Sequence, residues 1–269
     1  MLSKNICRCD NNTLAGNTDT SLLKMLALIF MLTDHLGKNV FPGIPEMRII
    51  GRMALPLYAW CMVVGSVKTS SPVRYVLRLL LMAVISQPIY MIALNHSWSE
   101  LNIMFTLLIA LVCIQGIRAN WLGSQIWVPA LCFFLVGILN QLLGISVDYG
   151  WKGILFVIML YLAKDTRSGL CSTFLAYALF WGASSSTVKS IFGMPIAFLS
   201  IPGIGSVIAA FFRLQGMIWL SLPLILCHTK SNIKIPKWLG YSLYPLHLIV
   251  LIIVELLCGT PFSVLLGVF

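Results

Sequence analysis

Two neighbouring residues with acid–base chemistry lie near the end of the first apolar segment. Asp34 and His35 follow the run LLKMLALIFMLT, which has the length and composition of a membrane segment. A carboxylate at the centre of a membrane helix costs about 2.5–3.5 kcal/mol, so such groups face a protein interior or a wet cavity and pair there. Histidine titrates near neutrality. We therefore expect this pair to face other polar groups and not lipid.

Two arginines and a second histidine are candidates for those polar groups. Arg48 and Arg52 lie one helical turn apart at the start of the second apolar segment, so they share a helix face. His247 lies about midway along the last apolar segment, with Tyr244 one turn before it. Two of the 4 histidines thus lie within apolar segments, which favours chemistry over a purely structural role.

The composition places these residues in a membrane protein. The chain has 269 residues, 59% hydrophobic and 10% charged, with a mean hydropathy of +0.94. Soluble domains are about a quarter charged, so a soluble enzyme is excluded. The net charge of +10 fits basic loops beside anionic lipids and not a nucleic-acid partner. The 8 cysteines lack metal-site spacing, so we expect no metal and no bound cofactor.

The apolar runs predict the elements that must position the site. They indicate an all-α, polytopic transmembrane helical bundle of about nine spans, in a range of eight to ten. We expect the spans at 22–37, 49–67, 75–94, 102–117, 125–144, 151–163, 169–186, 204–228 and 239–258. The run 188–228 is ambiguous, because it also fits two helices or a partly inserted loop before one helix. We divide the chain into a disordered, polar cytoplasmic tail (1–21), one transmembrane domain (22–260) and a short C-terminal tail (261–269).

Basic residues set the predicted orientation. With nine spans and a cytoplasmic N-terminus, most Lys and Arg residues fall on the cytoplasmic side, as the positive-inside rule requires. We therefore predict a multi-pass protein of the bacterial inner or plasma membrane. In this orientation polar residues of several spans converge in the outer half of the membrane, where spacing and topology predict a polar cavity. They are Asp34, His35, Arg48, Arg52, Gln87, Asn102, Thr106, Asn140, Gln141, Asp148, Tyr149, Lys152, Arg213, Gln215 and His247.

Some of these residues also have structural explanations. Asp34 can pair with Lys38 one turn later, can pair with Arg52, or can orient His247. Arg48 can extend its guanidinium group to the membrane interface.

Two further arginines lie at the cytoplasmic start of the third span. Arg74 and Arg78 are one turn apart and share a face. Guanidinium groups bind phosphate oxygens in a bidentate manner, which suits a phosphorylated ligand. Positive-inside anchoring is the alternative explanation.

Six stretches, in order, resemble the TraX family, which is named for a conjugal-transfer protein that acetylates the N-terminus of F-pilin. They are LKMLALIFMLTDHLG, IGRMALPLYA, LRLLLMAVISQP, LNIMFTL, DYGWKGIL and YSLYPLHLIVL, and they cover most of 22–258. The family's motif residues fall on Asp34, His35, Gly51, Arg52, Arg78, Gln87, Asn102, Ile103, Tyr149, Gly150 and His247. Leu55 departs from the usual aromatic residue before the proline, and 164–203 offers no match.

The resemblance implies a multi-pass membrane acyltransferase, similar to the broader acyltransferase-3 superfamily, that uses acetyl-CoA. The expected acceptor is an amine or hydroxyl of a pilin N-terminus or a cell-surface glycan. The catalytic residues are expected to be His35, Asp34, His247 and Arg52. Residues expected to bind the acyl group or acceptor are Arg48, Gln87, Asn102, Thr106, Tyr149 and Tyr244. Arg74 and Arg78 are expected to bind CoA phosphates.

In this hypothesis His35 is the base, and Asp34 orients either His35 or His247. Arg52, with Asn102 or Gln87, stabilises the oxyanion. The two histidines can exchange roles. Two other functions fit the same residues: a proton-coupled secondary transporter or flippase that uses the polar cavity, and a non-catalytic assembly protein.

Overall fold

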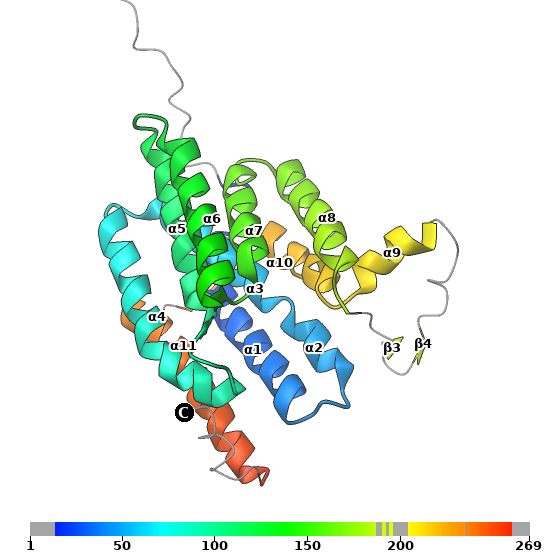
Figure 1. The fold of residues 1–269 in the computed structure, drawn as a ribbon. Helices are drawn as coiled ribbons and strands as arrows, with labels where there is room; N and C mark the ends of the chain where they lie inside the picture. Colours follow the sequence, from blue (N-terminus) through cyan, green and yellow to red (C-terminus); the bar gives the residue numbers. More distant parts are fainter. Residues whose placement is uncertain (1–13, 187–189, 192–193, 196–203, 234, 260–269) are drawn as a thin grey trace, which may run out of the picture.

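The computed structural model describes residues 14–186, 190–191, 194–195, 204–233 and 235–259, and helices dominate them (Figure 1). The helices are α1 (Thr20–Asn39), α2 (Pro45–Gly51), α3 (Ala54–Lys68), α4 (Pro72–Leu94), α5 (Ile103–Ala119), α6 (Ser124–Leu143), α7 (Gly150–Leu162), α8 (Arg167–Ala183), α9 (Ile204–Phe212), the 3₁₀ helix η2 (Gly216–Ser221), α10 (Leu222–Leu226) and α11 (Lys237–Leu257). The predicted all-α class therefore fits the described residues.

Two pairs of very short strands complete the described elements. β1 (Glu100–Leu101) pairs in parallel with β2 (Ser146–Val147), and β3 (Ser190–Ile191) pairs antiparallel with β4 (Met194–Pro195). The first pair joins the loop before α5 to the loop before α7, so two connections far apart in sequence are held together.

Five helical segments of the described chain are long and apolar enough to cross a membrane. They are Thr20–Asn39, Pro45–Lys68, Pro72–Leu94, Ser124–Leu143 and Leu239–Leu257. Three further apolar helices are shorter, namely Ile103–Ala119, Gly150–Leu162 and Gly216–Leu226. The chain is a membrane protein on these grounds, whereas the count of nine spans stays a prediction.

The predicted disordered tail needs a correction at its end, because residues 14–19 pack against the bundle. The Ala15 N–H donates to the Lys164 carbonyl at 2.8 Å, and the Trp60 indole N–H donates to the Asn17 carbonyl at 2.7 Å. Asp19 then caps α1 by accepting from the Leu22 N–H. These polar residues are ordered because their hydrogen bonds are satisfied inside the fold. The rest of the tail (1–13) and the predicted C-terminal tail (261–269) lie outside the described residues.

The predicted second span is interrupted where α2 meets α3. Arg52 caps the end of α2, and α3 begins again at Ala54. Pro56 explains the break, because it has no N–H to donate to the carbonyl four residues earlier, that of Arg52, and its ring crowds that carbonyl. A helix interruption thus holds Arg52 inside the bundle.

The predicted eighth span, 204–228, is wrong as a single helix. The chain turns at Arg213–Gln215, between α9 and η2. The Arg213 guanidinium group donates to the Ala183 carbonyl at 2.6 Å, at the end of α8. A Cβ on Gly182 or Gly216 would lie within 2.0 Å of the Ala210 carbonyl oxygen, so glycines permit this close packing.

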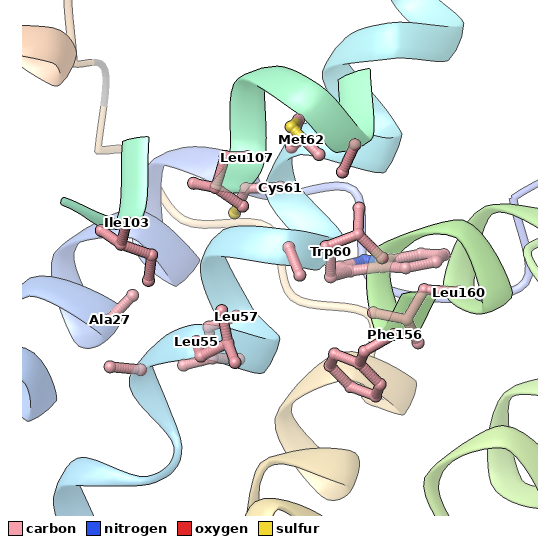
Figure 2. Close-up of a cluster of buried hydrophobic side chains, with 14 of the residues drawn as sticks. Ala27, Leu55, Leu57, Trp60, Cys61, Met62, Ile103, Leu107, Phe156 and Leu160 are labelled. Carbon is pink, nitrogen blue, oxygen red and sulfur yellow. The ribbon is translucent and has the colours of Figure 1, made fainter. Parts of the chain in front are cut away.

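The central helix of the bundle is α3. It packs against α1, α5 and α7, and its Leu57 and Trp60 are fully buried. Figure 2 shows this core, where Trp60 lies close to Phe156 and Leu160 of α7, and Leu107 of α5 lies beside Cys61 and Met62. Apolar contacts on several sides of α3 therefore fix the helices that carry the site.

Five basic side chains gather at one end of the bundle. This end, which we call the basic end, carries Lys24, Lys68, Arg74, Arg78 and Arg118. At the opposite end α1 finishes at Asn39, α4 at Leu94 and α11 at Leu257. In Figure 1 α11 passes behind α4, and both α4 and α1 contact it. The seam between α1 and α11 brings the first and last helices together.

Candidate active site

Asp34 is held by two guanidinium groups. Its Oδ1 accepts from the Arg48 Nε at 3.0 Å, and its Oδ2 pairs with Arg52 Nη2. The side chains of Arg52 and Asp34 are only 5% and 10% exposed. Of the alternatives left open by the sequence, pairing with Arg52 is confirmed. Lys38 makes no ion pair with Asp34 in the described chain.

The ion pairs form because α1 and α2 approach very closely. A Cβ on Gly51 would lie 2.3 Å from the Asp34 Cβ, and one on Gly37 would lie 2.6 Å from the Met47 Cβ. Small residues at helix contacts allow such approach in membrane proteins. Gly51, which precedes Arg52 directly, is therefore needed for the position of Asp34.

The two intramembrane histidines lie against each other. The ring centroids of His35 on α1 and His247 on α11 are 5.6 Å apart, and the rings are nearly parallel at 16°. His247 is 4% exposed, and neither of its ring nitrogens makes a hydrogen bond of ordinary geometry within the described residues. The carbonyls of Leu243 and Tyr244 are the polar groups near it on its own helix. The predicted convergence of His35 and His247 is confirmed.

Tyr244 lies at the centre of a wider polar group. Its ring centroid is 5.1 Å from that of His247, which confirms that they share a face of α11. Tyr58, Tyr90, Asp148 and Tyr149 are all within electrostatic range of its hydroxyl. Polar residues of α3, α4 and the loop before α7 therefore lie in the neighbourhood of Tyr244.

The loop before α7 places Asp148 and Tyr149 within electrostatic range of Arg52. The Asp148 N–H donates to the Leu101 carbonyl at 2.9 Å, and the Thr106 hydroxyl donates to the Asp148 carbonyl. Tyr149 has φ +61°, a left-handed conformation that bulky residues rarely adopt and that is more common at functional sites. Burial raises the pKa of Asp148 to about 6, and Arg52 opposes this increase. The Thr106 hydroxyl thus holds this loop, and its predicted part in binding the acyl group or acceptor stays a prediction.

Gln87 and Asn102 use their amide groups within the fold. The Asn102 Nδ2 donates to the Ala83 carbonyl at 2.9 Å and to the Gln87 Oε1 at 2.8 Å. The Gln87 Nε2 donates to the Glu100 carbonyl at 2.8 Å. Both N–H groups of the Asn102 amide are thus engaged in joining α4 to the start of α5, whereas the Gln87 amide has a second N–H, so its predicted contact with an oxyanion stays a prediction.

Two adjoining pockets open at the basic end. The first pocket has a volume of about 470 Å³, and it is lined by Lys68, Thr69, Ser70, Ser71, Arg74 and Arg78. The second pocket, of about 400 Å³, shares Lys68, Thr69 and Arg78 with the first and extends between α1, α3, α4, α5 and α11. Both predicted arginines therefore line a cationic pocket beside a second, more apolar one.

The second pocket includes the start of α11, the helix that carries His247. Tyr241 lines this pocket, Tyr244 follows one turn later, and His247 follows after another turn. This spacing keeps the three side chains on one side of the helix. Tyr58 lines the same pocket and is also near Tyr244. The pocket and the histidine pair are thus separated by the buried Tyr244.

Three members of the polar group were not predicted as site residues: Tyr58, Tyr90 and Asp148. Asp148 was predicted to lie with Tyr149 at the outer polar cavity, but it was given no role in the site. Tyr58 and Tyr90 lie in long apolar runs, where a tyrosine is as often a packing residue.

Comparison with known proteins places the chain in a family. The TraX protein family model matches residues 19–255. An uncharacterized protein of Rickettsia prowazekii is 29% identical over 150 residues, which cover 55% of this chain and 57% of that protein, so the match spans little more than half of that relative. The probable fimbrial assembly protein FimC (serogroup H1) of Dichelobacter nodosus is 27% identical over 245 residues, which cover 85% of this chain and 92% of that protein. No solved structure matches the chain. With its family model aligned from the α1 cap almost to the end of α11, the chain belongs to the TraX family.

Proposed function

We propose that the protein is a membrane acyltransferase that moves an acetyl group from acetyl-CoA to an amine or hydroxyl acceptor. The observation that carries this proposal is the contact between His35 and His247 beside the Arg52–Asp34 ion pair. Acyl transfer requires a base for the acceptor proton and a positive group for the oxyanion, and these side chains supply both.

The residue roles follow from the partners of each side chain. His35 or His247 takes the proton from the acceptor, whose nitrogen or oxygen then attacks the acetyl carbonyl and displaces the CoA thiolate. Asp34 is occupied by two arginines, so its role is to hold Arg52 and not to orient an imidazole. Arg52 faces the developing oxyanion.

The donor enters from the basic end. In the predicted orientation this end faces the cytoplasm, where acetyl-CoA is available. Arg74, Arg78 and Lys68 line the first pocket and suit the CoA phosphates. The second pocket suits the pantetheine arm, because it is more apolar and is lined by Tyr241, which lies one turn before Tyr244 and two turns before His247 on α11.

The acceptor is reached from the opposite end. FimC of Dichelobacter nodosus is described as a probable fimbrial assembly protein, which supports a role near pilin. A pilin N-terminus and a cell-surface glycan are both acceptors of the required chemistry.

Purified protein incubated with radiolabelled acetyl-CoA and a candidate acceptor tests the proposal. We expect labelled acceptor and an equal amount of free CoA thiol from the native chain. His35→Ala should abolish transfer while membrane insertion is unchanged. His228→Ala, which changes an exposed histidine, is the control. Gradient-dependent substrate flux without any requirement for acetyl-CoA would instead identify a transporter.

A further inference from the structure

Glu255 is a buried carboxylate that the proposed mechanism does not use. It lies near the end of α11, is 4% exposed, and accepts a hydrogen bond from the Asn39 Nδ2 at 2.6 Å. Asn39 also donates to the Ala93 carbonyl at 3.1 Å, so the ends of α1, α4 and α11 meet at this carboxylate. A buried carboxylate with no cation is costly, since burial penalises its charged form.

No cation compensates Glu255 within the part of the chain that the structure describes. Every ion pair found there involves Asp34, Glu100 or Asp165. Lys38 precedes Asn39 directly, yet its side chain is exposed and makes no ion pair with Glu255. The polar partner that Glu255 does have, the Asn39 amide, is neutral.

Glu255 lies along the same two helices, α1 and α11, as the histidine pair. His35 and Asn39 are one turn apart on α1, about 6 Å along the helix axis. His35 contacts His247 on α11, and Asn39 contacts Glu255 on the same helix. The carboxylate therefore lies on the α1–α11 seam, between the histidines and the end of the bundle opposite the donor pockets.

We infer that Glu255 binds the cationic, ammonium form of an amine acceptor and so selects amines over hydroxyls. This inference rests on the proposed acyltransferase function. An ammonium group that enters from the end opposite the donor would meet Glu255 before it reaches His35. It then gives one proton to a histidine, and the neutral amine attacks the acetyl carbonyl. The C–S bond breaks, and the second proton that the nitrogen loses as the amide forms passes to the departing CoA thiolate, which leaves as the free thiol.

Matched acceptors test this role. Tri-alanine amide carries an N-terminal ammonium group, and lactyl-alanyl-alanine amide replaces it with a hydroxyl of the same position and size. The full chain in proteoliposomes is assayed with acetyl-CoA and each acceptor. For Glu255→Gln we expect KM for the amine to rise about tenfold or more while kcat is retained. KM for the hydroxyl acceptor should stay unchanged.

Glu255→Gln isolates the charge from the structural contact. Glutamine keeps an oxygen that accepts from Asn39, so the helix ends stay joined, and the unfolding temperature verifies this. Glu100→Gln changes an exposed carboxylate at the same end and should leave both KM values unchanged. A Glu255→Gln variant whose amine KM equals that of the native chain, or whose two KM values rise together, overturns the inference.

The wild-type protein separates this inference from the proposed function. Transfer to the hydroxyl acceptor alone would overturn the ammonium site and leave the acyltransferase in place. Absence of both acetyl transfer and thiol release with either acceptor would overturn the acyltransferase, and the ammonium site with it.

Discussion

At the scale of single residues, we expect the largest effect on stability from Asp34, whose carboxylate pairs with both Arg48 and Arg52. Asp34→Asn would leave the guanidinium groups of Arg48 and Arg52 facing a neutral amide. Removal of one partner from a buried ion pair costs about 3–5 kcal/mol, and we expect the lower part of this range because the Arg48 side chain is 29% exposed. The unfolding temperature in detergent measures the loss.

Asp165→Asn is the matched control for that prediction. Its carboxylate is 45% exposed and pairs with the adjacent Lys164, so its loss should cost less than about 1 kcal/mol. Equal effects of the two substitutions would contradict a special role for Asp34.

Asp148 gives a residue-scale prediction for pH. Burial raises its pKa from the ordinary 3.8 to about 6, so the folded chain holds more protons than the unfolded chain between these values. The contribution of this carboxyl to stability is therefore greatest at acidic pH and is lost as the pH rises through about 6. The unfolding temperature of Asp148→Asn should lack this decrease between pH 4 and 6. If the unfolding temperatures of the native chain and Asp148→Asn change in parallel with pH, this prediction is wrong.

At the scale of elements, the sequence predicted where most helices lie but not where two of them break. The expected first span, 22–37, corresponds to α1 (Thr20–Asn39). An unbroken apolar run in a membrane forms a helix, because its backbone hydrogen bonds must be satisfied within the segment. The break before α3 came from Pro56, which is tolerated in membrane helices and therefore gave no clear signal. The turn at Arg213 depends on carbonyls of α8, and such a tertiary contact is invisible in sequence.

The contact between α1 and α2 gives a prediction for an element. Gly51→Ala would place a methyl group 2.3 Å from the Asp34 Cβ, so the helices must separate. We expect a cost of about 1–3 kcal/mol from overpacking, together with loss of acetyl transfer because Arg52 moves with α2. Gly43→Ala is the control, since nothing lies within 4 Å of its added Cβ. Full activity of Gly51→Ala would show that the close approach is dispensable.

At the scale of the whole molecule, the sequence predicted which polar residues converge better than it predicted the role of each one. The convergence of Asp34, His35, Arg52 and His247 followed from the predicted topology, which placed the end of the first span, the start of the second and the middle of the last in or near the outer half of the membrane. The engagement of Gln87 with Asn102 depended on hydrogen bonds that no spacing reveals. Sequence thus predicts which groups meet, while the structure decides which of them are already paired.

The placement of the donor pockets at the basic end predicts from which side of the membrane acetyl-CoA must be supplied. If the donor binds Arg74, Arg78 and Lys68, acetyl-CoA must be supplied on the side that these residues face. Inverted membrane vesicles expose the cytoplasmic face and should acetylate an acceptor enclosed in their lumen, whereas right-side-out vesicles given external acetyl-CoA should not.

Substitution of the pocket arginines tests the same arrangement. Arg74→Ala and Arg78→Ala should each raise KM for acetyl-CoA by about tenfold, since a charge-assisted hydrogen bond contributes about 1.5–3 kcal/mol and this site is open to solvent. The KM for the acceptor should not change, because the acceptor approaches the histidines from the other end. Arg167→Ala removes an exposed arginine that begins α8 and lines neither pocket, so its KM for acetyl-CoA should equal that of the native chain. An equal rise for all three variants would mean that only the overall positive charge attracts the donor.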